Sequence, residues 1–165
     1  MKQAGCQVLL TTFDGESAAP LNARKMRRLA QILFEINRLS PEEMPGVQLP
    51  QHLLLRTLVD QVKIRQDKLI HGDYHLDNIV EDGEQFTVID WTNGQRGDPR
   101  YDFAWSLLLQ RVFVSERLAS IFRAAYLGEH PMSQEELTAL KRSFVSGAFC
   151  FAGKRRVSWR KSGES

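Results

Sequence analysis

Three oxygen-bearing side chains at fixed spacing are the residues of this sequence that could do chemistry. Asp73 is followed by four residues and then by Asn78, and Asp90 comes directly after the apolar run that follows them. A carboxylate and a carboxamide can share Mg²⁺, which takes only one or two carboxylates and fills its shell with phosphate oxygens and water. The other carboxylate is left to accept a proton from an attacking hydroxyl. Together these groups could serve phosphoryl transfer.

Two simpler interpretations of the same stretch stay open at this point. Asp and Asn are common turn formers, so the three residues could merely shape loops. His71 and His75 lie four apart with Asp73 between them, which could suggest zinc. Zinc is disfavoured, because no helix carries the two histidines and no third soft ligand is near.

A β-hairpin is the element that must position these side chains. Residues 68–73 form a short β-type run that leads into a loop, and two further β-type runs at 78–82 and 84–91 meet near Asp82-Gly83. Asp-Gly between such runs is a strong hairpin signal. A hairpin folds back on itself, so we expect Asn78 at its entry and Asp90 at its exit to come close together, with Asp73 nearby.

Helices are predicted to surround this hairpin, which indicates a mainly α fold with a small hairpin, an α+β class. Apolar residues spaced three and four apart predict an amphipathic helix at 23–39. Similar patterns predict helices at 51–65, 101–113, 115–126 and 133–151. A strand is predicted at 6–13, a turn at 14–17, and loops at 40–50 and 92–100.

The composition is that of an ordinary soluble globular domain. The chain has 165 residues, of which 42% are hydrophobic and 25% charged, and its formal net charge is +2. So small a net charge does not favour nucleic acid or membrane as a partner. No stretch approaches the ~18 apolar residues of a membrane helix. The two cysteines form neither a disulfide framework nor a zinc pattern, so we expect a cytoplasmic protein.

Two motifs carry a resemblance to a known family. "HGDYHLDN" at 71–78 and "VIDWTNGQRGDPRYDFAW" at 88–105 resemble the aminoglycoside phosphotransferase and choline kinase-like family, and the likeness runs from Gln7 to Leu109. It implies a protein-kinase-like fold that phosphorylates small-molecule hydroxyls with ATP and Mg²⁺. His75 stands where protein Ser/Thr kinases tend to carry Lys, which favours a small-molecule acceptor over a protein.

The resemblance also implies roles for particular residues. Asp73 would be the catalytic base, and Asn78 and Asp90 would be magnesium ligands. Three further residues would give the site structural support without doing chemistry: His71, Asp98 and Asp102.

The resemblance covers only the C-terminal lobe of such a kinase. No Gly-rich phosphate loop or strand lysine precedes the catalytic motif. We therefore expect residues 1–15 to be a remnant of the interlobe linker strand, 16–153 the helical lobe, and 154–165 a basic tail. The exposed interlobe face would favour self-association. The alternative function is a catalytically inactive, truncated pseudokinase lobe that binds a partner.

Overall fold

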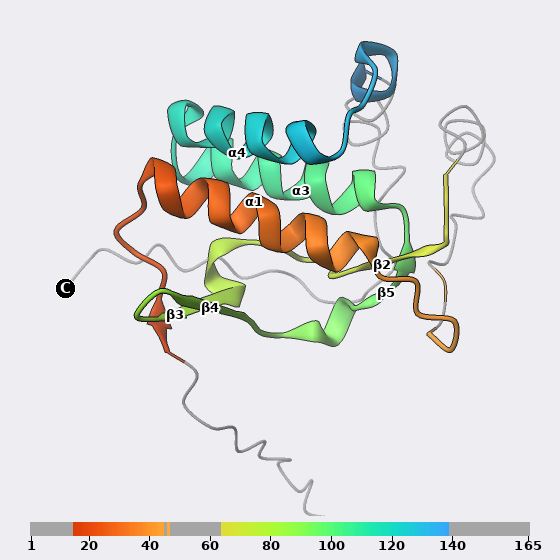
Figure 1. Cartoon of the computed structure of the whole chain (residues 1–165), viewed down its shortest axis with the longest axis horizontal. Helices are drawn as coiled ribbons and strands as arrows, with labels where there is room; N and C mark the ends of the chain where they lie inside the picture. The colour runs from red at the N-terminus through yellow and green to blue at the C-terminus, as the bar shows by residue number, and fades with distance from the viewer. Residues whose placement is uncertain (1–14, 45, 47–63, 139–165) are drawn as a thin grey trace, which may run out of the picture.

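The computed structural model describes residues 15–44, 46 and 64–138 of the chain. Three helices form its larger layer, and short strands lie along one side of them (Figure 1). The helices are α1 (Ala23–Arg38), α3 (Pro99–Phe113) and α4 (Glu116–Glu129). The strands are β1 (Glu16–Ser17), β2 (Lys68–Ile70), β3 (Ile79–Asp82), β4 (Gln85–Val88) and β5 (Gln95–Gly97), with short 3-10 turns η1 (Leu76–Asn78) and η2 (Trp91–Asn93).

Helix α1 confirms the amphipathic helix predicted at 23–39. Its apolar stripe buries Met26, Leu29 and Leu33 completely. The helix begins after Asn22, whose side-chain oxygen accepts a hydrogen bond from the amide of Lys25 at 3.0 Å. Such an N-cap satisfies one of the amides that the first turn leaves without an intrahelical partner.

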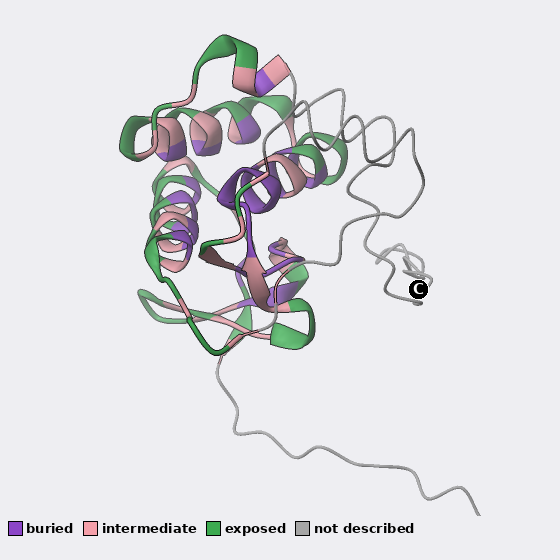
Figure 2. Ribbon diagram, turned by 90° about the vertical axis from the view of Figure 1, so that its right-hand side faces the viewer, coloured by how far each residue is buried: buried purple, intermediate pink, exposed green. Residues whose placement is uncertain are grey.

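The hydrophobic core lies where α1, α3 and α4 meet. Phe103 of α3 stacks on Tyr126 of α4 with ring centroids 4.6 Å apart, and it also stacks on Phe122. All three side chains are buried. Figure 2 shows the buried faces of the helices turned toward one another and toward the strands beneath them. This core holds the three helices together, and they support the loops that follow β2 and β4.

The predicted hairpin is present as β3 and β4. These strands pair antiparallel from Ile79 with Val88 to Asp82 with Gln85, so Gly83 and Glu84 form a two-residue turn. Gly83 has φ +61°, which suits the first central position of a type II′ turn. The structure adds β1 to the other edge of β3, so the predicted turn at 14–17 is wrong for Glu16 and Ser17.

A second small sheet replaces part of the loop predicted at 92–100. Strand β5 pairs antiparallel with β2, from Lys68 with Gly97 to Ile70 with Gln95. The sequence of β5 has no strand pattern, so its extended form comes from a partner far away in the chain. Helix α3 begins earlier than predicted, with Pro99 in its first turn, where a missing N–H costs nothing.

Several predicted elements lie wholly or partly outside the described residues. These are the strand at 6–13, the helix at 51–65 up to residue 63, the helix at 133–151 beyond residue 138, and the basic tail at 154–165. Residues 134–138 are helical. The second predicted helix does not extend to its expected end, because Ile64 and Arg65 are not helical. The amide of Arg65 donates instead to the carboxylate of Asp98 at 3.0 Å. The α+β class predicted from the sequence is confirmed.

Candidate active site

The loop His71-Gly72-Asp73 leaves the end of β2 and turns sharply at its glycine. Gly72 has φ +79°, a conformation that L side chains rarely adopt. A Cβ at this position would lie 2.6 Å from the backbone oxygen of Asn93. The loop therefore passes so close to the last residue of η2 that only glycine fits.

Asp102, in the first turn of α3, binds the backbone of this loop. Its carboxylate accepts hydrogen bonds from the amide of His71 at 2.6 Å and from the amide of Gly72 at 2.8 Å. The side chain is fully buried. Burial raises the pKa of Asp102 to about 6, even though the two amides and Asn37 favour its ionised form. Asp102 thus fixes the backbone of the two residues that precede Asp73.

Asn37 and Tyr126 extend this hydrogen-bond network to two other helices. The carboxamide N–H groups of Asn37 donate to the carbonyl of Leu69 at 3.0 Å and to Asp102 at 3.2 Å. The hydroxyl of Tyr126 donates to the carboxamide oxygen of Asn37 at 2.8 Å. The sequence interpretation missed both residues. Asn37 did leave a signal, because it is a polar residue four positions after Leu33 on the buried stripe of α1.

The carboxylate of Asp73 is contacted at both oxygens. The indole N–H of Trp105 donates to Oδ1 at 3.0 Å, and Nε2 of His75 lies 3.4 Å from Oδ2. Burial alone would raise the pKa of Asp73, but the bonds from His75 and Trp105 outweigh it and lower the pKa. Asp73 is therefore ionised at neutral pH. The contact of Trp105 with Asp73 was not foreseen from the sequence.

Asn78 ends the turn η1 and is buried beside Asp73. Its Nδ2 donates to the backbone carbonyl of Asp73 at 2.9 Å and lies 3.2 Å from Nε2 of His75. This orientation leaves the carboxamide oxygen without a hydrogen bond from any described residue. The backbone carbonyl of Asn78 accepts the amide of Ile89 at 2.9 Å, so the hairpin ladder reaches one residue short of Asp90.

Asp90 follows β4 in a strained backbone conformation. It is the one non-glycine residue among those described with a positive φ, at φ 55° and ψ 63°. Its Oδ1 accepts from the hydroxyl of Thr92 at 2.5 Å and caps η2, while Oδ2 has no hydrogen bond from a described residue. Outliers of this kind cluster at functional sites, where surrounding structure offsets their cost of about 1–3 kcal/mol.

His71 links the segment of Asp73 to the segment of Asp90. Its Nδ1 accepts from the amide of Asp73 at 3.2 Å, so Nε2 carries the proton and donates to the carbonyl of Ile89 at 2.9 Å. Burial lowers the pKa of His71 and outweighs the opposing effects of Ile89 and of the two carboxylates. The ring is therefore neutral at neutral pH, as these two hydrogen bonds require.

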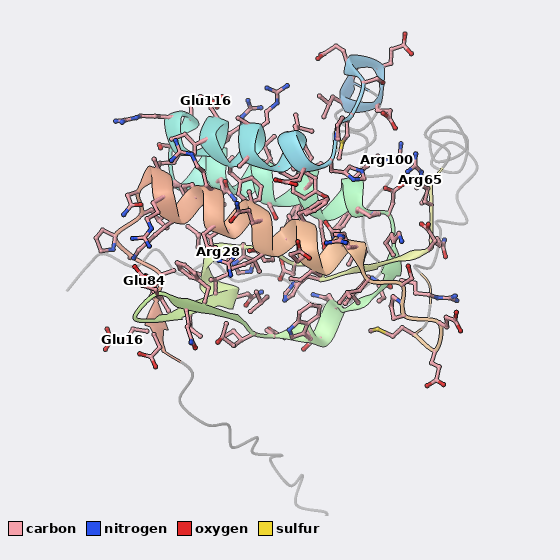
Figure 3. The ribbon with its side chains drawn as sticks, viewed as in Figure 1. Glu16, Arg28, Arg65, Glu84, Arg100 and Glu116 are labelled. Atoms are coloured by element: carbon pink, nitrogen blue, oxygen red, sulfur yellow. The ribbon has the colours of Figure 1, made fainter. Side chains whose placement is uncertain are left out.

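Asp98 lies at the start of α3 and supports that helix rather than the loop of Asp73. Its carboxylate caps the helix through the amide of Arg100 and forms a buried ion pair with the same residue's guanidinium at 2.6 Å. The hydrogen bond to Asp98 and the negative charge of that carboxylate raise the pKa of Arg100. Arg65 and Arg100 lie at the same end of the molecule, where both contact Glu136 (Figure 3).

Two side-chain oxygens of this region are of the chemical type that Mg²⁺ prefers. The unused oxygens of Asn78 and Asp90 are hard donors at the open end of one hairpin. No group of three His, Cys, Asp or Glu side chains within residues 15–44, 46 and 64–138 could hold a metal ion by itself. A set of one carboxylate and one carboxamide suits Mg²⁺, which completes its shell from substrate phosphates and water.

A helical platform, an Asp-x-x-x-x-Asn loop and a hairpin followed by Asp are the parts that phosphotransferases of the kinase-like class combine. The chain belongs to the phosphotransferase enzyme family APH, whose family model matches residues 13–135. This match confirms the family predicted from the two motifs. No curated protein matches the chain significantly. Within the described residues, no helix is long and apolar enough to cross a membrane.

Proposed function

We propose that this protein transfers the γ-phosphate of ATP to a hydroxyl group of a small molecule. Membership of the phosphotransferase family supports the reaction class. One network carries the proposal. His71 bonds the amide of Asp73 and the carbonyl before Asp90, and Asn78 bonds the carbonyl of Asp73. These hydrogen bonds connect the proposed base, Asp73, to the two proposed magnesium ligands, Asn78 and Asp90.

Asp73 accepts the proton of the acceptor hydroxyl in this proposal. The acceptor oxygen forms a new bond to the γ-phosphorus, the bond from that phosphorus to the β,γ-bridging oxygen breaks, and ADP leaves. The lowered pKa of Asp73 keeps its carboxylate ionised and ready to orient the hydroxyl. Asn78 and Asp90 would hold Mg²⁺, which supplies charge neutralisation on the phosphates when bound.

The acceptor is proposed to be cationic, such as an aminoglycoside or a choline-like alcohol. Asp73 places a carboxylate against the acceptor, which favours a positively charged partner. The proposed partners are the nucleotide and this small hydroxyl compound, and nucleic acid is not among them. The proposed location is the cytoplasm.

We propose that residues 16–153 form the helical lobe, with 1–15 as an interlobe linker strand and 154–165 as a basic tail. The β1–β3 pairing supports the first boundary, because Glu16 and Ser17 join the hairpin sheet directly. Self-association through the interlobe face stays a prediction, and the oligomeric state measured by light scattering tests it.

The test is transfer of labelled phosphate from Mg-ATP to a panel of hydroxyl compounds. Asp73→Asn should lower the rate by roughly 10²- to 10⁴-fold, the usual contribution of a general base. Asp77→Asn is the matched control, because Asp77 lies in the same loop with its side chain 77% exposed, and it should keep the wild-type rate.

Two outcomes would contradict the proposal in different ways. Unchanged transfer by Asp73→Asn would remove Asp73 from the chemistry. Absence of transfer to any compound, with nucleotide still bound, would favour the alternative of an inactive pseudokinase lobe that binds a partner.

A further inference from the structure

A cavity of about 440 Å³ lies between the first half of α1 and the turn of the β3–β4 hairpin. Its size is within the range of small-molecule sites. Helix α1 supplies most of one wall, and the hairpin supplies the other. The helix contributes four basic side chains to the lining, and the hairpin contributes Glu81, Glu84 and Phe86. Figure 3 shows Arg28 on the side of α1 that faces the hairpin and Glu84 near the hairpin turn.

This cavity is separate from the candidate active site. Strand β3 runs from Ile79, beside Asn78, to Asp82 at the turn. At about 3.3 Å per residue, its length places the turn roughly 13 Å from the end where Asn78 and Asp90 lie. The hairpin residues that line the cavity all lie near this turn, and Asp73 is not among the lining residues.

Two ion pairs join the walls of the cavity. Lys25 contacts Glu81 at 2.5 Å with both side chains largely buried, and Arg24 contacts Glu84 at 2.7 Å on the surface. The largely buried Lys25–Glu81 pair holds helix and hairpin together, and the exposed Arg24–Glu84 pair adds little. Preformed walls lower the cost of ordering a site when a ligand binds.

The remaining charge of the cavity is positive. Glu81 and Glu84 are each paired with a cation. The guanidinium groups of Arg27 and Arg28 are the further positive charges in the lining. Neither has an ion pair with any residue in the described part of the chain. Adjacent, uncompensated guanidinium groups on a cavity wall attract anions, and their planar forks match phosphate oxygens in a bidentate manner.

We propose that this cavity binds a small molecule that carries two or more negative phosphate charges, at a site distinct from the candidate active site. Arg27 and Arg28 bind the phosphates. The half-buried ring of Phe86 offers an apolar wall to any organic part of the ligand.

The probe is inorganic pyrophosphate, titrated calorimetrically into the whole chain with EDTA present so that no divalent ion supports binding elsewhere. We expect one saturable site. Arg27→Ala/Arg28→Ala should weaken it by at least about tenfold, because charge-assisted hydrogen bonds are lost. Arg117→Ala/Arg123→Ala removes the same charge from α4 and should change the affinity less than about twofold.

The proposal is wrong if the wild-type chain shows no saturable binding, or if the two double variants weaken it equally, which would indicate only general attraction by positive charge. Circular dichroism verifies that each variant is folded. Titration with ADP under the same conditions separates the phosphate sources. Tighter binding of ADP than of pyrophosphate, lost in Phe86→Ala, indicates a phosphate ester, and equal affinities indicate free pyrophosphate. Only the binding that Arg27→Ala/Arg28→Ala removes belongs to this site.

Discussion

Asp73 shows how single side chains prepare the candidate base. One oxygen accepts the indole N–H of Trp105, and the other faces His75. Asn78 fixes the backbone of the same residue through its carbonyl. With its carboxylate and its backbone held at separate points, Asp73 has little freedom to turn away from an acceptor. Positioning of the reacting groups in this way is a main contribution of the protein to phosphoryl transfer.

Trp105→Phe tests the restraint on Asp73. The substitution removes a hydrogen bond that stabilises the ionised carboxylate, so the pKa of Asp73 should rise toward its ordinary value. Carbon-13 NMR of labelled aspartate can follow that titration. A pKa of Asp73 that does not change in Trp105→Phe would show that the indole contributes packing alone.

Asp102 predicts a pH dependence of stability. Its folded pKa of about 6 lies above the ordinary value of 3.8, so between pH 4 and pH 6 the folded state binds more protons than the unfolded state. Its contribution to the free energy of unfolding therefore decreases as pH rises through this window, by about 3 kcal/mol in total, and is constant above it.

Comparison of wild type with Asp102→Asn isolates this contribution, because the variant retains His71 and the other titrating groups. Urea unfolding at several pH values should show the difference between the two proteins changing from pH 4 to pH 6. A difference that is constant across that window would mean that Asp102 titrates at its ordinary pKa.

At the scale of elements, the loop after β2 depends on its neighbours for its shape. Asp102 of α3 holds the loop's amides, Asn37 of α1 joins Asp102 to β2, and Tyr126 of α4 orients Asn37. Each of the three helices therefore contributes one polar side chain to the same buried network. The helices position the site as well as forming the core.

Gly72→Ala should disturb this loop strongly. A Cβ would clash with the backbone of Asn93, and φ +79° is unfavourable for alanine. A loss of about 1–3 kcal/mol of unfolding free energy is expected, with displacement of Asp73. Gly128→Ala is the control, because nothing lies within 4 Å of its added Cβ and α4 gains helix propensity. Thermal unfolding of both variants measures the effect, and equal stabilities would contradict the close approach.

The sequence pattern predicted the elements whose conformation depends on residues that are close together in the sequence. The apolar stripe of α1 and a hairpin turn near Asp82-Gly83 are encoded in neighbouring residues, so both were predicted, although the turn itself is Gly83-Glu84. Strand β5 and the contact between Trp105 and Asp73 could not be predicted, because their partners lie more than twenty residues away. Asn78 was expected to lie close to Asp90, and the hairpin bonds it to Ile89, the residue before Asp90.

The whole molecule is organised around one core shared by three helices. Leu107 of α3 lies in that core at 8% exposure, whereas the next residue, Leu108, is 44% exposed. Because the site loop is attached to the same helices, loss of core packing should also weaken the site.

Leu107→Ala should lower the free energy of unfolding by about 2–5 kcal/mol, through lost burial and the cavity left behind. Leu108→Ala is the matched control, and it should cost less than about 1 kcal/mol because its side chain is already hydrated. Urea denaturation followed by circular dichroism measures both. Similar losses for the two variants would show that α3 packs differently.

The most direct test of the central claim is a titration of the isotopically labelled protein with Mn²⁺-ATP, followed by paramagnetic broadening of its backbone amide signals. Our account predicts that the amides of Asn78 and Asp90 broaden at the lowest concentrations, while those of α4 stay sharp. Asp90→Ala should abolish the effect. Broadening of α1 and the hairpin turn without any at Asn78 and Asp90, or broadening at Asn78 that Asp90→Ala leaves unchanged, would contradict a metal-nucleotide site formed by these residues.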